Sequence, residues 1–390
     1  MRVAIRTDAS AVMGTGHVMR CLCLASAIKA SGGHVEFICR SHPGHLGSYV
    51  QSKGFDVHLI PPGNEATLDG LPHASWLGSS WVEDAEGVTR ILAERPPFDW
   101  LVVDHYALDA RWERKLRPTV PRLMAIDDLA DRPHDCDLLL DQNLQPTDTN
   151  RYEPLVSSTC RVLLGPRYAL LRPEFREARA RVRERAGTVE RVHVYFGGAD
   201  VEDLTTRTVR VLARLGIADT LVEVFVGASN PRASEVRALC EHLGFTVYGH
   251  SETIAEAMTR SDLAIGAAGS SVWERCAVGL PAVTVGGAAN QEVLGILAAR
   301  EGVCAHMGPA RSISDACLSN AVRDLMTDAE RRADMSRKGL QLVDGLGVSR
   351  VMHEMAQTTP LSDVPLRTPE GLDSRAGRTA GRRPGHHPRI

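Results

Sequence analysis

A histidine in a glycine-bearing turn near the start of the chain is a candidate general base. The run GTGHVMR lies between a predicted strand and a predicted helix, and its small residues Gly14, Thr15 and Gly16 let the backbone approach a ligand closely. His17 stands at the start of the predicted helix, where the positive end of the helix dipole disfavours an imidazolium. The imidazole is therefore biased towards the neutral form, which accepts a proton near pH 7. The alternative is a histidine that only caps the turn.

A glycine- and serine-rich turn in the second half of the chain predicts a nucleotide site. An apolar strand leads into GAAGSS, and a helix follows. The backbone N–H groups of Gly269, Ser270 and Ser271, together with the helix dipole, can cradle a diphosphate. Glu274 lies one turn inside the helix, where its carboxylate can accept hydrogen bonds from the ribose hydroxyls. The alternative is a capping box, with Ser271 as N-cap and Glu274 three residues later.

Weaker signals accompany this turn. FGGAD follows the first strand of the second half, and Gly198 within it permits close approach of a phosphate or a uracil ring. Asn290 and Gln291 stand at the start of a later helix, where amides suit hydroxyls or phosphate oxygens. With the glycine–serine turn, these residues outline one wall of a cleft. Tyr106 follows the strand DWLVVD, where it can hydrogen-bond a sugar, position a water or pack at the rim.

Other nucleotide and catalytic motifs fit poorly or are missing. A dinucleotide fingerprint requires glycine where Met19 stands, and the second predicted strand ends in Cys39 and Arg40 instead of an acid for the ribose. The sequence has no Gly-x-Ser-x-Gly elbow, no P-loop and no His-Glu-x-x-His. The acidic stretch from Asp127 to Asp141 lacks a defined metal-ligand spacing, so its carboxylates are expected in caps and turns, with magnesium as the alternative. We therefore expect neither metal nor cofactor.

Composition is close to that of ordinary globular proteins. The 390 residues, with 43% hydrophobic and 24% charged, predict two or three domains. A net charge of −3 argues against nucleic acid as a partner. No apolar run approaches the roughly 20 residues of a membrane span, and the start MRVAIRTD resembles no signal peptide. The nine scattered cysteines predict a reduced, cytoplasmic protein.

Short apolar runs alternate with longer amphipathic ones, which is typical of parallel α/β units. The charged stretch LRPEFREARARVRERAG interrupts this pattern and predicts a solvated helix plus a linker. The expected fold is α/β, with two doubly wound Rossmann-like domains facing a cleft. We expect an N-terminal domain at 1–166, a linker at 167–187, a C-terminal nucleotide-binding domain at 188–357 and a disordered basic tail at 358–390. Strands are expected at 3–5, 34–39, 56–60, 99–104, 123–126, 138–140, 161–164, 192–196, 221–226, 246–248, 262–265 and 282–285, and helices at 17–30, 81–94, 313–326 and 329–343.

Six segments resemble one known family, in the same order along the chain: RTDASAVMGTGHVMRCLCLA, DWLVVDHYALDARWE, IDDLADRPHDCDLLLDQN, LLGPRYALLRPEF, FGGAD and GAAGSSVWERCAVGLP. The family is UDP-2,4-diacetamido-2,4,6-trideoxy-β-L-altropyranose hydrolase of pseudaminic acid biosynthesis, and the resemblance runs from about residue 2 to 345. A more distant relative is the peptidoglycan N-acetylglucosaminyltransferase. The resemblance therefore implies the two-domain GT-B architecture.

The resemblance also implies a metal-independent enzyme that removes UDP from a nucleotide-linked diacetamido sugar by attack of water on the anomeric carbon. It assigns the catalytic base to His17, ribose binding to Glu274, and substrate binding to Tyr106 and to the pair Asn290 and Gln291. One departure is the run AANQ, which replaces an acidic residue before Asn-Gln. The implied partners are the UDP-sugar and water, without nucleic acid or membrane, and a monomer is favoured.

Two other functions stay open. A GT-B glycosyltransferase, such as a spore-coat-polysaccharide type, would keep the nucleotide half and bind an acceptor in place of water. A non-catalytic nucleotide-sugar-binding protein would bind the same ligand without turnover. Product analysis separates the three.

Overall fold

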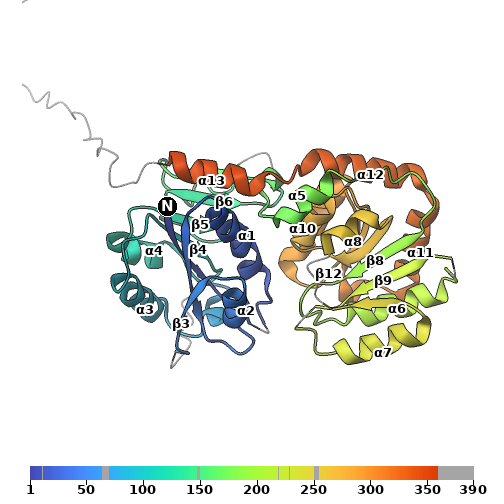
Figure 1. Ribbon diagram of the computed structural model, residues 1–390, viewed down its shortest axis with the longest axis horizontal. Helices are drawn as coiled ribbons and strands as arrows, with labels where there is room; N and C mark the ends of the chain where they lie inside the picture. Colours follow the sequence, from blue (N-terminus) through green and yellow to red (C-terminus); the bar gives the residue numbers. More distant parts are fainter. Residues whose placement is uncertain are drawn as a thin grey trace, which may run out of the picture.

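Two parallel sheets with helices on both faces lie side by side in the molecule (Figure 1). The computed structural model describes residues 1–10, 12–63, 70–146, 150–217, 219–227, 229–249 and 254–358, and the side chains of residues 289 and 290 lie outside this description. Apart from Thr358, the predicted basic tail also lies outside the described residues. No helix in the described part of the chain is long and apolar enough to cross a membrane.

The first sheet has seven parallel strands in the order β3-β2-β1-β4-β5-β6-β7. Its strands are mostly apolar, because helices cover a parallel sheet on both faces. The strand order reverses between β1 and β4, and ligands of such sheets bind beyond the strand ends at this reversal. The strands are β1 (Arg2–Thr7), β2 (His34–Arg40), β3 (Asp56–Ile60), β4 (Trp100–Asp104), β5 (Leu123–Ile126), β6 (Leu138–Asp141) and β7 (Arg161–Leu164).

Helices of the first half connect these strands. They are α1 (Gly16–Ala30), α2 (Gly47–Ser52), α3 (Trp81–Ala93) and α4 (Ala110–Leu116), with short 3-10 helices η1 (Ala74–Leu77), η2 (Arg117–Thr119) and η3 (Pro166–Tyr168). The last helix, α13 (Gly347–Gln357), returns from the second half and packs against α1 (Figure 1). Val351 and Met355 of α13 are buried in the first core, although the predicted boundaries group this helix with the C-terminal domain.

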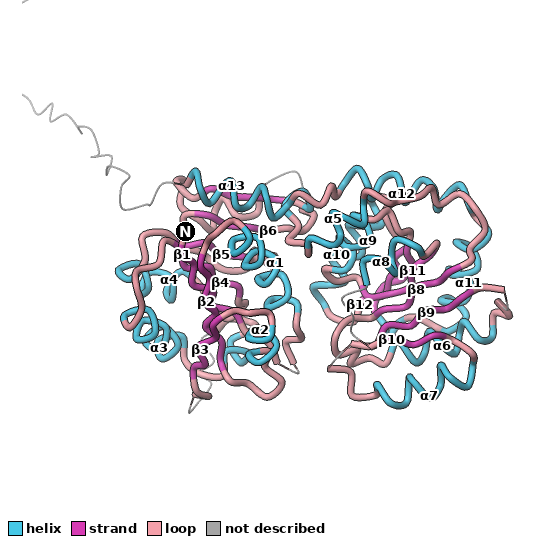
Figure 2. The backbone as a smooth tube through the Cα atoms, in the orientation of Figure 1, coloured by secondary structure: helices cyan, strands magenta, loops and turns pink. Residues whose placement is uncertain are grey.

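The second sheet has six parallel strands in the order β10-β9-β8-β11-β12-β13, with its reversal between β8 and β11 (Figure 2). Its strands are β8 (Arg191–Tyr195), β9 (Leu221–Phe225), β10 (Thr246–Tyr248), β11 (Leu263–Ala267), β12 (Ala282–Gly286) and β13 (Ala305–Pro309). Its helices are α6 (Leu204–Arg214), α7 (Ala233–Leu243), α8 (Ile254–Arg260), α9 (Ser271–Ala277), α10 (Ala289–Arg300), η4 (Ala310–Ser312), α11 (Asp315–Thr327) and α12 (Ala329–Leu342). Both predicted doubly wound sheets are confirmed.

The predicted strands and helices are confirmed with shifts of one or two residues at their ends. The sequence analysis did not predict α2, α4, β13 and α13. The helices α2 and α4 have six and seven residues, which is too short for a helical period to emerge. The strand β13 lies at the edge of the second sheet and has the mixed sequence AHMGP, without the apolar run of the central strands.

The helix predicted in the charged stretch is present, but it is only partly exposed to solvent. The helix α5 (Pro173–Arg179) packs against α8 and α9, with Phe175 and Ala178 buried on one face. Further along, the guanidinium of Arg185 is buried and donates to the backbone carbonyls of Thr259 and Ser261. A highly charged segment is therefore compatible with burial here, because the two apolar residues share a face and the carbonyls pair with the arginine.

Candidate active site

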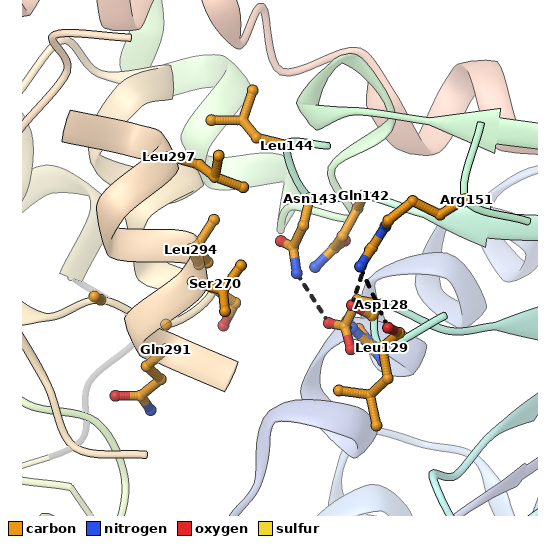
Figure 3. Close-up of a pocket in the computed structure, with 14 residues that line it drawn as sticks. Asp128, Leu129, Gln142, Asn143, Leu144, Arg151, Ser270, Gln291, Leu294 and Leu297 are labelled. Carbon is orange, nitrogen blue, oxygen red and sulfur yellow. Dashed lines mark hydrogen bonds and ion pairs between the residues drawn. The ribbon is translucent and has the colours of Figure 1, made fainter. Parts of the chain in front are cut away.

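A cavity of about 150 Å³ lies between the two halves of the molecule (Figure 3). The first half lines it with charged and amide side chains, and the second half with a glycine–serine turn and one face of α10. Three residues predicted to bind the nucleotide, Gly269, Ser270 and Gln291, are in this lining. The full lining comprises Arg20, Asp128, Leu129, Gln142, Asn143, Leu144, Arg151, Ala268, Gly269, Ser270, Gln291, Val293, Leu294 and Leu297.

His17 is held by a carboxylate at the end of the neighbouring strand. It is the second residue of α1, and its Nδ1 lies 2.6 Å from Oδ1 of Asp104, the last residue of β4. A carboxylate only accepts hydrogen bonds, so Nδ1 carries the proton, and Nε2 of a neutral imidazole keeps its lone pair. This contact excludes the alternative in which His17 only caps the turn.

Asp104 is ionised. Burial alone would raise the pKa of this carboxyl, but the charges and hydrogen bonds of Arg20 and His17 hold the pKa well below its usual range. Arg20 binds Asp104 in a bidentate manner, with Nε 2.6 Å from Oδ2 and Nη2 2.7 Å from Oδ1. The N-terminus of α1 and the carboxylate of Asp104 thus both act on His17.

Tyr106 packs against His17 without pairing with it. The two rings meet edge to face at 4.5 Å between centroids, and Trp76 of η1 lies 5.7 Å from Tyr106. The phenol donates to Oδ1 of Asp128 at 2.5 Å. Burial and the nearby Asp128 charge raise the pKa of Tyr106, so the phenol stays protonated. Tyr106 therefore forms a wall beside the imidazole, and its hydroxyl engages Asp128.

The turns that precede α1 and follow β8 touch each other across the two halves. Gly14 has a φ of +76°, and its N–H donates to the carbonyl of Ser10. Thr15 is the N-cap of α1, and Gly16 begins the helix. A Cβ on Gly198 of the FGGAD turn would lie 3.1 Å from Oγ1 of Thr15. Glycine at this position allows the close approach.

The turn after β11 has a different cap from the one predicted. Ser270 is the N-cap of α9 and makes no side-chain capping bond, whereas Ser271 is already helical. Its hydroxyl accepts from Nη1 of Arg275 at 3.1 Å. The capping-box alternative with Ser271 as N-cap is therefore wrong, and Glu274 is not engaged in capping.

Glu274 faces an arginine instead of the cavity. Its side chain is 20% exposed, and Oε1 lies 3.5 Å from Nη2 of Arg172. Arg172 is the residue before α5 and also pairs with Glu174 at 2.9 Å. The contact to Glu274 is long for a hydrogen bond, and Arg172 keeps Glu174 as a closer partner.

Gln291 joins the turns that follow β11 and β12. Its Oε1 accepts from the N–H of Gly287 at 3.0 Å. Its Nε2 lies 3.5 Å from the place that a Cβ on Gly269 would take. Asn290 belongs to α10, but its side chain lies outside the described residues.

The acidic stretch from Asp127 to Asp141 is neutralised mainly by arginines. Arg132 pairs with Asp127 at 2.8 Å, Arg117 with Asp137 at 2.5 Å and Arg151 with Asp141 at 3.0 Å. Among the residues that the structure describes, no three His, Cys, Asp or Glu side chains are grouped so as to hold a metal ion.

Tyr106 was predicted as a site residue, but Asp104, which pairs with His17, and Arg20, which binds Asp104, were not. Asp104 and Arg20 were visible at the end of DWLVVD and in GTGHVMR, but nothing local links them. The signal that could have found Asp104 is the pairing of β4 with β1, which sets Thr7 beside Asp104 at the reversal of strand order.

Comparisons with known proteins support the fold and a distant homology. No family model matches the chain. The UDP-2,4-diacetamido-2,4,6-trideoxy-β-L-altropyranose hydrolase of Campylobacter jejuni is 27% identical over 276 residues, which are 70% of this chain and 87% of that protein. The spore coat polysaccharide biosynthesis protein SpsG of Bacillus subtilis is 25% identical over 198 residues, 50% of this chain and 58% of that protein.

Among solved structures, MurG of Acinetobacter baumannii superposes with a TM-score of 0.62 at 14% identity, over 92% of this chain and 99% of that chain. This likeness confirms the predicted GT-B fold. The protein thus has the GT-B fold, and its distant homology to a UDP-sugar hydrolase indicates an enzyme.

Proposed function

We propose that this protein is a hydrolase that releases UDP from UDP-2,4-diacetamido-2,4,6-trideoxy-β-L-altropyranose, a step of pseudaminic acid biosynthesis. The observation that carries the proposal is the His17–Asp104 pair, whose partner Arg20 lines the cavity together with the glycine–serine turn. The homology to the hydrolase of Campylobacter jejuni supports the choice of reaction and of sugar.

In this proposal His17 acts as the general base. Nδ1 donates to Asp104, so Nε2 accepts a proton from water while the water oxygen bonds to the anomeric carbon. The bond between that carbon and the diphosphate oxygen breaks, and its electron pair leaves with UDP. The ionised Asp104 stabilises the imidazolium that forms, as buried carboxylates do beside catalytic histidines.

The second half supplies the nucleotide site in this proposal. Backbone N–H groups of Gly269, Ser270 and Ser271 and the amides of Gln291 and Asn290 bind the diphosphate and stabilise its growing charge. Gly198 leaves room for close approach beside Thr15. Glu274 exchanges its long contact with Arg172 for the ribose hydroxyls. No metal is assigned a role.

A UDP-sugar glycosyltransferase is the second candidate: the relative SpsG is named for polysaccharide biosynthesis, and the GT-B fold is compatible with glycosyl transfer. Incubation with UDP-diacetamido sugars, without an acceptor, separates the candidates by mass detection of products. A hydrolase yields UDP and free sugar. A requirement for an acceptor indicates the transferase, and absence of turnover with retained binding indicates a binding protein.

The variant His17→Asn tests the assigned base. We expect kcat to fall by roughly 10²–10⁴-fold, the usual contribution of a general base. UDP affinity should persist, because the nucleotide contacts lie in the other half. His58 is a matched control, since its Nε2 also pairs with a carboxylate, that of Glu36, at 2.7 Å. The variant His58→Asn should leave kcat unchanged, and an equal loss in both variants would contradict the assignment.

A further inference from the structure

A side-chain amide connects the two halves at the cavity. Asn143 follows β6 and lines the cavity (Figure 3). Its Oδ1 accepts from Nε1 of Trp273 in α9 at 2.9 Å, and its Nδ2 donates to Oδ2 of Asp128 at 3.0 Å. The indole N–H only donates and the carboxylate only accepts, so the two partners fix the orientation of the amide.

Asp128 links Asn143 to the residues around the candidate catalytic pair, His17 and Asp104. Its Oδ2 also accepts from Nη1 of Arg20 at 3.0 Å, and its Oδ1 accepts from the phenol of Tyr106. Arg20 in turn holds Asp104, which holds His17, and Tyr106 packs against the imidazole. The hydrogen bonds thus run from α9 to both groups that fix His17.

Most of the network is buried, which strengthens its hydrogen bonds. Trp273 is fully buried, and the side chains of Arg20 and Asp128 are 8% and 10% exposed. Hydrogen bonds to a charged group in such surroundings are stronger than neutral ones, and the loss of one partner leaves the charge poorly satisfied. The donor from Asn143 is therefore one of the groups that hold the Asp128 carboxylate in place.

We infer that Asn143 is a positioning residue: it ties the helix that begins at the glycine–serine turn to the side chains that orient His17. The inference rests on the proposed function for its kinetic readout only. Because Asn143 acts through Asp128, its loss should affect kcat, while the affinity for UDP stays the same.

Three single variants test the two hydrogen bonds of Asn143, to Trp273 and to Asp128, separately. Asn143→Asp keeps an acceptor for Trp273 and replaces the donor to Asp128 by a carboxylate oxygen. Trp273→Phe removes the indole N–H that donates to Oδ1 of Asn143. Gln145→Glu is the matched control, because it makes the same amide-to-acid change in the same loop, at a side chain that contacts Asp141 and Arg151.

We expect Asn143→Asp to lower kcat about tenfold, which equals about 1.4 kcal/mol in activation free energy. Trp273→Phe lowers kcat by a smaller factor, and Gln145→Glu leaves it unchanged. Calorimetry gives the same UDP dissociation constant for all three. The double variant Asn143→Ala with Trp273→Phe is no slower than Asn143→Ala, since both changes remove the same bond.

Wild-type kcat in Asn143→Asp overturns the inference. A parallel loss of kcat, UDP affinity and melting temperature in Asn143→Asp and Gln145→Glu also overturns it, because that pattern indicates a purely structural role. Should the wild type hydrolyse no UDP-sugar, the proposed function fails, and NMR of the His17 ring still tests the inference. The Cε1–H signal should move in Asn143→Asp and Trp273→Phe and stay in Gln145→Glu. An unmoved signal in Asn143→Asp overturns it.

Discussion

The carboxyl ends of the central strands carry opposite chemistry in the two halves. In the first half, β1 is followed by Asp8, β4 ends in Asp104, and β5 is followed by Asp127, all of them buried. In the second half, β8, β11 and β12 lead into FGGAD, GAAGSS and GGAAN. The same strand arrangement thus presents arginine-paired carboxylates on one side and turns rich in glycine and alanine on the other. The glycines of the second half let a diphosphate approach the backbone closely.

Arginines offset the free-energy cost of burying the carboxylates of the first half. Burial would raise the pKa of Asp8, but Arg6, helped by His105 and His42, holds it well below the usual range. Arg20 does the same for Asp104. In the first half, buried ion pairs therefore hold the candidate base His17, whereas the backbone and amide groups of the second half are the ones that the proposed function assigns to the ligand.

Of the variants considered, Asp104→Asn should lower kcat the most. The amide can present its N–H to Nδ1 of His17, which would favour the wrong tautomer, and Arg20 loses its charged partner. We expect kcat to fall on the order of 10⁴-fold, as when the buried aspartate of a serine-protease triad is replaced by asparagine. UDP affinity should be retained, because the nucleotide contacts are assigned to the second half. Steady-state kinetics and calorimetry measure the two.

Glu36 provides the control for this variant. It is a buried carboxylate of β2 that pairs with His58 and His34, away from the reversal of strand order. Glu36→Gln should retain wild-type kcat. A similar loss of kcat in both variants would show that buried pairing in general, and not the His17 contact, sets the rate.

Buried histidines in the two halves predict a different pH dependence of the unfolding free energy. In the first half, burial opposes protonation of His134, but Glu113 and Asp127 raise its pKa to about 9. The resulting stabilisation is fully present below the unfolded value of about 6.5 and is lost as pH rises through 9, a change of about 3 kcal/mol in unfolding free energy. In the second half, burial, with Arg275 and Arg260 nearby, lowers the pKa of His193 to about 3.

The two histidines should therefore respond to pH with opposite sign. The unfolding free energy of the wild type relative to His134→Gln should fall as pH rises from 6.5 to above 9. Relative to His193→Met, it should fall as pH drops below about 6.5, because the folded protein disfavours the charged form. Urea unfolding across this range measures both, and equal pH dependence in the two comparisons would contradict the assigned charge states.

Glu274→Ala addresses the nucleotide half. Loss of a charged partner for the ribose hydroxyls should weaken UDP binding by about 1.5–3 kcal/mol. Glu256, in the first turn of the neighbouring α8, is the control, and Glu256→Ala should bind UDP as the wild type does. Unchanged affinity in a folded Glu274→Ala variant would leave this carboxylate only its contact with Arg172.

Chelation should have the smallest effect. Asp127, Asp137 and Asp141 pair with Arg132, Arg117 and Arg151, and among the described residues no three His, Cys, Asp or Glu side chains are grouped so as to hold a metal ion. Turnover measured with and without EDTA should be equal. Loss of turnover that magnesium restores would place a metal in the reaction.

Local patterns in the sequence were sufficient for much of the fold. Apolar runs predicted most of the strands, and the turns around Gly14, Gly198 and Gly269 were placed correctly after β1, β8 and β11. These features depend on neighbours in the chain, so composition and period reveal them. The exceptions are the short helices α2 and α4 and the strand β13, which carry too few apolar residues, and α13, although its apolar residues recur at helical spacing.

Contacts between distant residues were beyond such patterns. Arg20 lies 84 residues from Asp104 and 108 from Asp128, and Trp273 lies 130 residues from Asn143. Their meeting depends on the strand order and on how the two halves face each other. The capping box was predicted wrongly for a related reason, since the sequence does not show that Ser271 is already helical or that Glu274 meets Arg172.

Hydrolysis in ¹⁸O-labelled water tests the central claim most directly. If His17 activates water at the anomeric carbon, the C–O bond breaks and the label appears in the free sugar. Mass spectrometry of both products after complete turnover of the UDP-diacetamido sugar reads out the label. Label in the sugar, with unlabelled UDP, is the predicted result. Label in UDP would show attack at phosphorus and would contradict this mechanism even if His17 were essential.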